Sequence, residues 1–594
     1  MSERGAVSRA DFLFVRDLLF RFRLDRSVSG LEPAESLVTR CGITFHSEAV
    51  SALGVCLLFL GVLCRPTQAP VAAVAHGPAT GLPARMSWPW SARIWLLVGL
   101  VPVVQYLAGG LVFRGDAALG FMYALGGALS IYTGCLWAAQ EGRGPVLRML
   151  FVTLVLAAIA EAGLALVQWL RLPNPGWWAM DLINDRPYGN FAQPNLFGLL
   201  MVMGMVAATA LFEMRVLSHR ASYVLTMVLL GFGMLASESR ASVLALLTVV
   251  AFWFVSRNRV RTRLRVPEVL FGLLVGFAVH RYMGVVEEAL YLKVELTREM
   301  LEVGPRAGIW RQYLAAIAEH PWLGYGFEQG MLALREIAAH AEPARNANYA
   351  HNFVLDLMAW AGVPLGMILS AGIGLWMLSW LRSTPDRELL AQRHWVFAVW
   401  LAFTVQSLLE FPFAHAFFLL PATLLAGVIT TAPQARAVAD ARQPARAAAS
   451  RSALVFGVLG IALLAALCYD YFRLEGDFRS ERFLRGHFVG APIYDPYAHP
   501  FILDQFAALN ASSRIELRAG MPAEELQELG VIARRFHLLR SRMDYAKALA
   551  LNGRMPEAEQ EMTVIRATYH PSRFARIEDE WRQWLEQNSI VTGR

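Results

Sequence analysis

One long apolar stretch decides the fold class of this chain. Residues 221–256 read ASYVLTMVLLGFGMLASESRASVLALLTVVAFWFVS. As a single helix this stretch would be about 54 Å long, whereas the hydrocarbon core of a bilayer is about 30 Å thick. The stretch must therefore turn, and its one run of polar residues is Ser-Glu-Ser-Arg at 237–240. We expect two membrane-spanning helices that are joined by this turn.

The composition of the whole chain is also that of a membrane protein. The chain has 594 residues, of which 56% are hydrophobic and 17% are charged, whereas a soluble chain averages about 25% charged residues. Its 54 basic residues are all arginine except Lys293 and Lys547, and they are scattered between apolar runs. Because they form no continuous basic face, we expect no binding to nucleic acid.

Further stretches of about 20 mainly apolar residues predict the other spans. The predicted fold is all-α, a polytopic bundle of about twelve transmembrane helices, or thirteen if the N-terminal segment also crosses. The predicted spans are 48–64, 94–113, 119–139, 146–171, 194–214, 221–238, 240–256, 267–284, 352–381, 394–410, 414–430 and 452–470.

The arginine-rich loops predict the orientation, because an excess of arginine in short loops marks the cytoplasmic side. If the spans alternate, four such loops share one side: those with Arg143 and Arg148, Arg215 and Arg220, Arg257 to Arg265, and Arg436 to Arg451. The opposite face then carries 172–194, 237–240, 285–351, 410–415 and the C-terminal tail. In a bacterium that face is periplasmic, so we expect a multi-pass protein of the inner membrane.

This topology divides the chain into an N-terminal segment 1–45, transmembrane helices 46–284, a large periplasmic loop 285–351, transmembrane helices 352–470 and a periplasmic helical domain 471–594. The segment Asp11–Leu24 (DFLFVRDLLFRFRL) is typical of an interfacial helix, and a degenerate first span is the alternative. The segment Asp544–Ser572 resembles one tetratricopeptide-like helical hairpin, and a generic small helical domain explains it equally well.

Polar residues at a membrane mouth are costly, so their clustering on the outer face indicates a functional site. Arg186–Asn195 (RPYGNFAQPN) combines Arg186 and Tyr188 with the amides of Gln193 and Asn195 at the start of a span. A helix cap with a turn is the simpler interpretation. Arg240 in the 237–240 turn offers a planar fork of donors that suits phosphate oxygens. A salt bridge to Glu238 is the alternative.

Three further clusters lie in the second half of the chain. Arg306–Gly326 predicts a helix that ends at His-Pro-Trp-Leu-Gly, with Arg306 and Arg311 as candidate phosphate contacts or, alternatively, as part of a solvated loop helix. His351 and Asn352 precede a long span. Neighbouring positive charge would keep the histidine neutral and able to accept a proton, and a cap or interface residue is the alternative for this histidine. Glu410 lies in a short turn between two spans and is a candidate contact for substrate. A salt bridge to an arginine from another loop is the alternative.

The sequence indicates no cofactor. It contains no Asp-rich metal motif, P-loop, dinucleotide-binding glycine fingerprint or G-x-S-x-G elbow, and its five cysteines show no metal-ligand spacing. We therefore expect neither a bound metal nor a nucleotide.

Taken together, these motifs resemble the bacterial O-antigen ligase and O-antigen polymerase superfamily, and within it the PglL-type O-linked oligosaccharyltransferases. The resemblance rests on Arg186–Asn195, Ser239–Arg240, Arg306–Gly326, His351–Gly366 (HNFVLDLMAWAGVPLG), and Glu410-Phe-Pro-Phe with the following FFLLPATLLAGV. The soluble C-terminal extension also fits that branch.

The resemblance implies en bloc transfer of a glycan from undecaprenyl pyrophosphate to an acceptor hydroxyl. Arg240 and Arg306, together with Arg311, would neutralise the pyrophosphate, and His351 would act as general base without a metal. Arg186, Tyr188, Gln193, Asn195, Asn352 and Glu410 would contact the substrates.

The acceptor we expect first is a serine or threonine of a periplasmic or pilin protein, because of the Arg186–Asn195 signature and the C-terminal tail. Lipid A core, as for a ligase, comes second, and a growing glycan, as for a polymerase, comes third. A transporter of lipid-linked glycans ranks lower, because transporters place polar residues near mid-membrane, whereas here they gather at one mouth.

Overall fold

The computed structural model describes a helical membrane protein. It describes residues 37–64, 85–176, 178–182, 186–290, 292, 306–338, 347–430, 448–449, 451–486, 490, 493–536, 538–569 and 571–588. Within these ranges the only strands are β1 (Arg85–Met86) and β2 (Ala448–Ala449), which form one short parallel pair. The predicted N-terminal helix Asp11–Leu24 lies outside the described residues.

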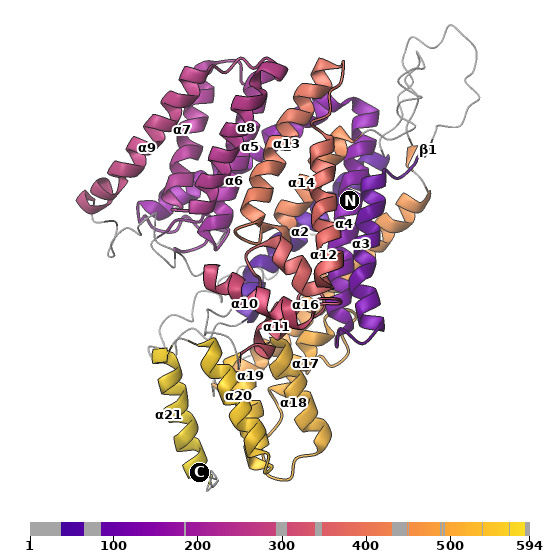
Figure 1. Cartoon of the computed structure of the whole chain (residues 1–594), viewed down its shortest axis with the longest axis vertical. Coiled ribbons are helices and arrows are strands. Elements are labelled where there is room, and N and C mark those ends of the chain that lie inside the picture. The colour runs from indigo at the N-terminus through magenta and orange to yellow at the C-terminus, as the bar shows by residue number, and fades with distance from the viewer. Residues whose placement is uncertain are drawn as a thin grey trace, which may run out of the picture. The chain divides into compact units, whose positions relative to one another are not determined.

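Each predicted span overlaps a helix of the described chain (Figure 1), and the helix that covers 352–381 is kinked at Gly362, where the backbone is not helical. These helices are α2 (Leu37–Cys64), α3 (Trp90–Leu107), α4 (Arg114–Glu141), α5 (Arg143–Trp169), α6 (Pro194–Glu213), α7 (Arg220–Ala236), α8 (Arg240–Val260), α9 (Val266–Ala289), α12 (Phe353–Ser379), α13 (Arg387–Ser407), α14 (Ala416–Ile429) and α16 (Arg451–Arg485). The predicted turn separates α7 from α8, with Arg240 as the first residue of α8. Among the described residues, nine helices are long and apolar enough to cross a membrane, and α7 and α14 are apolar but shorter. The total of twelve spans remains a prediction.

The chain forms two compact units. Unit 1 comprises Met1–Ser47, Phe151–Val250 and Arg261–Arg298, as far as these are described. In it α6 packs on α7, and α7 packs on α9. The α6 helix is buried over most of its length, and the carboxylate of Glu213 at its end accepts the backbone N–H groups of Arg263 and Leu264 at 2.7 and 2.9 Å. One arginine-rich loop is thereby fastened to the helix bundle.

Unit 2 comprises Glu48–Leu150, Ala251–Val260 and Glu299–Arg594. Its transmembrane part is built around α4, which packs against α3, α14 and α16. The approach of α4 to α14 requires a glycine, because a Cβ on Gly427 would lie 2.3 Å from the carbonyl oxygen of Ile131. The loop helices α10 (Arg306–Glu319) and α11 (Gly330–Glu336) pack against α12, and η3 (Pro412–Ala414) leads into α14. The predicted stop of α10 at His-Pro-Trp-Leu-Gly is confirmed.

The C-terminal part of unit 2 is also helical. It contains α17 (Asp504–Ser512), α18 (Ala523–Phe536), α19 (Leu539–Leu551), α20 (Met555–Thr568) and α21 (Pro571–Gln587). Residues 544–572, predicted as two helices joined by a turn, contain most of α19 and all of α20, which contact each other. The tetratricopeptide-like character of this pair remains a prediction. The helix α16 continues without a break through residues 470 and 471, where the sequence predicts the start of the soluble domain.

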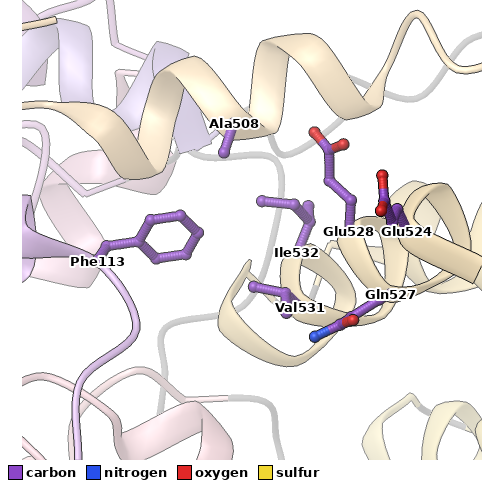
Figure 2. Close-up of a pocket in the computed structure, with 7 residues that line it drawn as sticks. All are labelled: Phe113, Ala508, Glu524, Gln527, Glu528, Val531 and Ile532. Atoms are coloured by element: carbon purple, nitrogen blue, oxygen red, sulfur yellow. The ribbon is translucent and has the colours of Figure 1, made fainter. Parts of the chain in front are cut away.

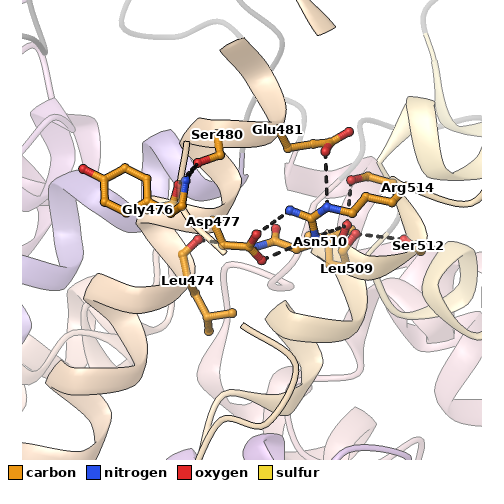
Figure 3. A network of polar contacts seen from close by, with 11 residues as sticks. Leu474, Gly476, Asp477, Ser480, Glu481, Leu509, Asn510, Ser512 and Arg514 are labelled. Carbon is orange, nitrogen blue, oxygen red and sulfur yellow. Dashed lines mark hydrogen bonds and ion pairs between the residues drawn. The ribbon is translucent and has the colours of Figure 1, made fainter. Parts of the chain in front are cut away.

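Polar contacts join the end of α16 to α17 (Figure 3). The carboxylate of Asp477 is almost completely buried; it pairs with the guanidinium of Arg514 and accepts the amide of Asn510 at 3.2 Å. Nε of Arg514 also lies 3.3 Å from Glu481. A buried charge persists only when it is paired and hydrogen-bonded, so this network fixes α17 on the extension of α16.

Two buried ion pairs dock the C-terminal helices on the rest of unit 2. Arg535 on α18 donates to both carboxylate oxygens of Asp116 on α4, at 2.7 and 2.8 Å. Arg335 on α11 makes a two-point pair with Glu561 on α20. Because forked pairs of this kind are directional, they set the orientation of the C-terminal helices on α4 and α11.

Candidate active site

The start of α12 is set by Asn352. Its side-chain oxygen accepts the backbone N–H groups of Val354 and Leu355 at 3.1 and 3.4 Å. This is the N-cap arrangement, which satisfies donors that the first turn of a helix leaves unpaired. The cap that the sequence offered as the alternative for His351 is thus made by Asn352, whose predicted contact with substrate remains a prediction.

His351 lies one residue before this cap in a constrained turn. Its φ of 54° is in the left-handed region, which is uncommon for a residue other than glycine. The preceding residue is held from two sides, because the N–H of Ala350 donates to Asp356 at 2.7 Å and its carbonyl accepts the indole N–H of Trp310 at 2.9 Å. The local fold over-determines this turn, as is common where backbone strain serves a functional site.

Glu410 joins His351 to Arg306, and we call these three residues the unit 2 triad. Oε2 of Glu410 lies 2.9 Å from Nδ1 of His351, and Oε1 pairs with the guanidinium of Arg306. The Glu410 side chain is 2% exposed, whereas those of Arg306 and His351 are 26% and 24% exposed. The carboxylate is thus enclosed, while its two partners reach the surface of the site.

The electrostatics of the unit 2 triad favour an ionised Glu410. Burial raises the pKa of this carboxyl, but the hydrogen bond from His351 and the positive charge of Arg306 outweigh it, so the pKa lies below its usual value. An ionised carboxylate can only accept hydrogen bonds. The shared hydrogen therefore belongs to Nδ1 of His351, and Nε2 is the ring nitrogen that does not contact Glu410.

Aromatic rings line the histidine. The edge of His351 faces Phe411 with the ring centroids 5.0 Å apart, and Tyr349 stacks on the same Phe411 at 5.0 Å. The hydroxyl of Tyr349 donates to Glu328 at 3.0 Å. Our sequence reasoning missed Tyr349, Phe411 and Asp356, although their positions beside His351 and Glu410 in the chain were a usable signal.

Arg311 also lies on α10, five residues after Arg306. At 100° per residue the two side chains project from different sides of the helix. Nε of Arg311 donates to the carbonyl of Ala307 on its own helix at 3.4 Å. A joint role of both arginines toward one ligand stays a prediction.

In unit 1 the structure brings the Arg186–Asn195 segment onto the turn before α8. Nε and Nη2 of Arg186 donate to the carbonyl of Ser237 at 2.9 and 2.7 Å, and Nη2 also contacts Oδ1 of Asn195 at 3.3 Å. Arg240 begins α8 three residues after Ser237 and is half-buried. We call Arg186, Asn195, Ser237 and Arg240 the unit 1 turn cluster.

Tyr188 belongs to the framework of this segment. It is 1% exposed, and its hydroxyl donates to the carbonyl of Asp181 at 2.5 Å. The side-chain oxygen of Gln168 on α5 accepts the backbone N–H groups of Tyr188 and Gly189 at 3.0 and 2.8 Å. Burial and these bonds give Tyr188 a structural role, and its predicted substrate contact stays untested.

Two polar residues on α5 that our sequence reasoning missed support the same segment, and a polar side chain inside an apolar span was the available signal. Glu161 accepts the backbone N–H of Asn190 at 2.8 Å, and Gln168 makes the bonds described above. Gly189 has a φ of 57°, and a Cβ there would lie 2.2 Å from Glu161. Gln193 immediately precedes α6, whose first residue is Pro194.

A cavity of about 380 Å³ lies in the C-terminal part of unit 2 (Figure 2). It is bounded by Phe113, by Ala508 on α17 and by α18, which contributes Glu524, Gln527, Glu528, Val531 and Ile532. Burial raises the pKa of Glu528, and the neighbouring Glu525 adds to this effect. The cavity shares no lining residue with the unit 2 triad. No group of three or more His, Cys, Asp or Glu side chains in the described part of the chain is arranged to hold a metal ion.

Comparison with known proteins defines the class of this molecule. Residues 225–370 match the family described as O-antigen ligase, and residues 394–583 match the family described as the C-terminal part of the virulence factor membrane-bound polymerase. The matched segments include Arg240, Arg306, His351 and Glu410. These matches make the chain a helical membrane protein with domains of the O-antigen ligase family.

Relatives narrow the class. The chain is 27% identical over 541 residues to the general O-oligosaccharyltransferase of Acinetobacter baylyi, with 88% of each chain covered. It is 23% identical to the ComP-specific O-oligosaccharyltransferase of the same organism, over 57% of this chain and 61% of the relative. It is 25% identical to the O-antigen ligase of Pseudomonas aeruginosa, over 41% of this chain and 54% of the relative. These relatives, together with the two matched families, confirm the predicted resemblance to the PglL-type O-linked oligosaccharyltransferases within that superfamily.

Proposed function

We propose that the protein transfers a glycan en bloc from undecaprenyl pyrophosphate to serine or threonine hydroxyls of periplasmic or pilin proteins. The observation that supports this most strongly is the unit 2 triad, in which Nδ1 of His351 faces an ionised Glu410 beside Arg306, so that Nε2 is the ring nitrogen left for the acceptor hydroxyl. The relatives, two of them O-oligosaccharyltransferases, support transfer of glycan to protein. In this proposal the protein lies in the inner membrane with its site facing the periplasm.

In the proposed reaction Nε2 of His351 takes the proton of the acceptor hydroxyl as the oxygen attacks the anomeric carbon of the glycan. The bond from that carbon to the pyrophosphate oxygen breaks, and the electron pair leaves with undecaprenyl pyrophosphate. Glu410 stabilises the imidazolium, and Arg240, Arg306 and Arg311 stabilise the charge on the leaving group. Because these guanidinium charges are fixed, we expect transfer to persist in the presence of EDTA.

Arg306 has two roles in this scheme. One part of its fork holds Glu410, and a guanidinium has five N–H donors, so other N–H groups can face the leaving group. Arg186, Gln193, Asn195 and Asn352 are proposed contacts for the glycan or the acceptor.

Reconstitution tests the proposal. Purified protein incubated with lipid-linked glycan and a pilin acceptor is expected to give glycosylated protein and free undecaprenyl pyrophosphate. Movement of the lipid-linked glycan across the membrane without transfer would reject the enzyme and favour a transporter. A parallel reaction with lipid A core tests the ligase alternative, which the similarity to the Pseudomonas aeruginosa ligase supports.

Lysine substitution tests the arginines separately. Arg240→Lys and Arg306→Lys keep the charge but remove the fork, so each is expected to raise the KM for the lipid-linked donor about tenfold while acceptor KM stays unchanged. Unchanged donor kinetics in both variants would reject the pyrophosphate role.

A further inference from the structure

An apolar groove opens on the side of unit 1. It has a volume of about 400 Å³ and lies among α5, α7 and α9, with a lining that includes Trp169, Phe232, Ala278, Tyr282, Met283 and Val286. Its volume is in the range of small-molecule sites, about 300–1,000 Å³. Tyr282 and Val286 are 65% and 44% exposed. Since α9 is an apolar helix with little of its surface buried, the open side of the groove faces lipid.

One side of the groove is formed by Trp169, whose side chain is held by two contacts. Trp169, the last residue of α5, donates its indole N–H to the buried Glu287 at 2.8 Å. The same indole meets the ring of Phe232 edge to face, with the centroids 5.2 Å apart. An indole held by a hydrogen bond at one end and by an aromatic contact on its face keeps one orientation. The Trp169 side of the groove is therefore held in place by contacts with α7 and α9.

The groove lies close to the unit 1 turn cluster. Phe232 precedes Ser237 by five residues on α7, a rise of about 7.5 Å along the helix axis. Trp169 ends α5, and Ala278 to Val286 occupy the second half of α9. A ligand with its head at the turn that carries Arg240 can therefore extend an apolar chain into the groove.

We infer that this groove binds the first part of the polyprenyl chain of the lipid-linked donor. The inference rests on the proposed function, which places the pyrophosphate at Arg240. An isoprenoid chain matches an apolar, aromatic-walled groove that opens to lipid, and the rest of the chain continues into the bilayer. The pyrophosphate is thereby presented at the turn, and donors are selected by their chain as well as by their charge.

The test compares donors of different chain length. Ala278→Trp fills the groove, and it is expected to raise the KM for the undecaprenyl-linked donor about tenfold, since excluding two methylene groups from an apolar site costs about that factor. The KM for a donor whose pyrophosphate carries only a methyl group, and which therefore has no chain to place in the groove, should not change. Leu274→Trp is the matched control, because Leu274 is on the same helix, is 64% exposed and does not line the groove. Full preference for the long chain in Ala278→Trp would overturn the inference.

A binding experiment separates this inference from the proposed function. Undecaprenyl phosphate carrying a diazirine at its first isoprene units is expected to crosslink α7 and α9 of the intact protein in nanodiscs, and Ala278→Trp or Phe232→Ala should abolish most of that yield. Crosslinks at the groove without any glycan transfer would uphold the inference and reject the function. Normal transfer with crosslinks spread evenly over lipid-facing residues would overturn the inference and uphold the function. Full competition by ordinary phospholipid would also overturn the inference.

Discussion

The unit 1 turn cluster and the unit 2 triad use arginine in different ways. Arg186 donates to a backbone carbonyl and to an amide oxygen, neither of which changes charge with pH. Arg306 pairs with a buried carboxylate that also holds a histidine. The first arrangement fixes the shape of a turn, whereas the second lowers the pKa of a buried carboxyl that contacts a histidine. An arginine side chain therefore indicates chemistry only once its acceptor is known.

The largest expected effect is on kcat, and it distinguishes His351 of the unit 2 triad from another histidine of the loop 285–351. His351→Ala removes the proposed base and should lower kcat for glycan transfer by about 10²–10⁴. The matched control is His320→Ala, since His320 also contacts a glutamate, Glu336, at 3.0 Å but is half exposed. Steady-state kinetics on folded protein measure both. Full activity of His351→Ala would show that the unit 2 triad has no chemical role. The unit 2 triad would then not differ in function from the unit 1 turn cluster.

The next effect tests whether Glu410 acts through the histidine. Glu410→Gln keeps the size of the side chain but removes the charge that holds the hydrogen on Nδ1, so we expect kcat to fall about hundredfold with little change in acceptor KM. Glu336→Gln alters the other histidine–glutamate contact of the loop and serves as control. A change in acceptor KM alone would instead assign Glu410 to substrate binding.

In the unit 1 turn cluster the expected effect is on stability. Arg186→Lys loses the two-point contact with the carbonyl of Ser237, so the free energy of unfolding should fall by about 1–3 kcal/mol. Arg220→Lys is the control, because the pair of Arg220 with Glu268 is largely exposed and such pairs contribute about 0–1 kcal/mol. Thermal unfolding in detergent measures both. Equal small shifts would show that the turn does not depend on Arg186.

The smallest effect is a pH dependence of stability. The pKa of Glu410 is lowered in the folded protein, so its contribution to stability is fully present above its unfolded pKa, about 4.3, and is lost as pH falls through the folded value. The difference in unfolding free energy between the wild type and Glu410→Gln should therefore shrink as the pH falls below about 4. A difference that does not shrink below about pH 4 would contradict an ionised Glu410.

The sequence predicted the helices well because lipid imposes a local rule. Apolar runs of about 20 residues, broken at polar turns, must form spans whatever their neighbours are. The turn before Arg240 and the end of α10 at His-Pro-Trp-Leu-Gly follow from residues within a few positions. The hairpin of α19 and α20 follows in the same way. The predicted resemblance to the O-antigen ligase superfamily is confirmed for the same reason, because its motifs are short and contiguous.

The partners of the polar residues could not be predicted, because they depend on contacts between distant segments. His351 and Glu410 are 59 residues apart, and Arg306 and Glu410 are 104 apart. From the sequence, Glu410 was either a substrate contact or the partner of some arginine, and only the tertiary structure places it between Arg306 and His351. A charged side chain at a membrane mouth must find a partner. The sequence thus determined which polar side chains needed partners, and the packing of the helices decided which partners they have.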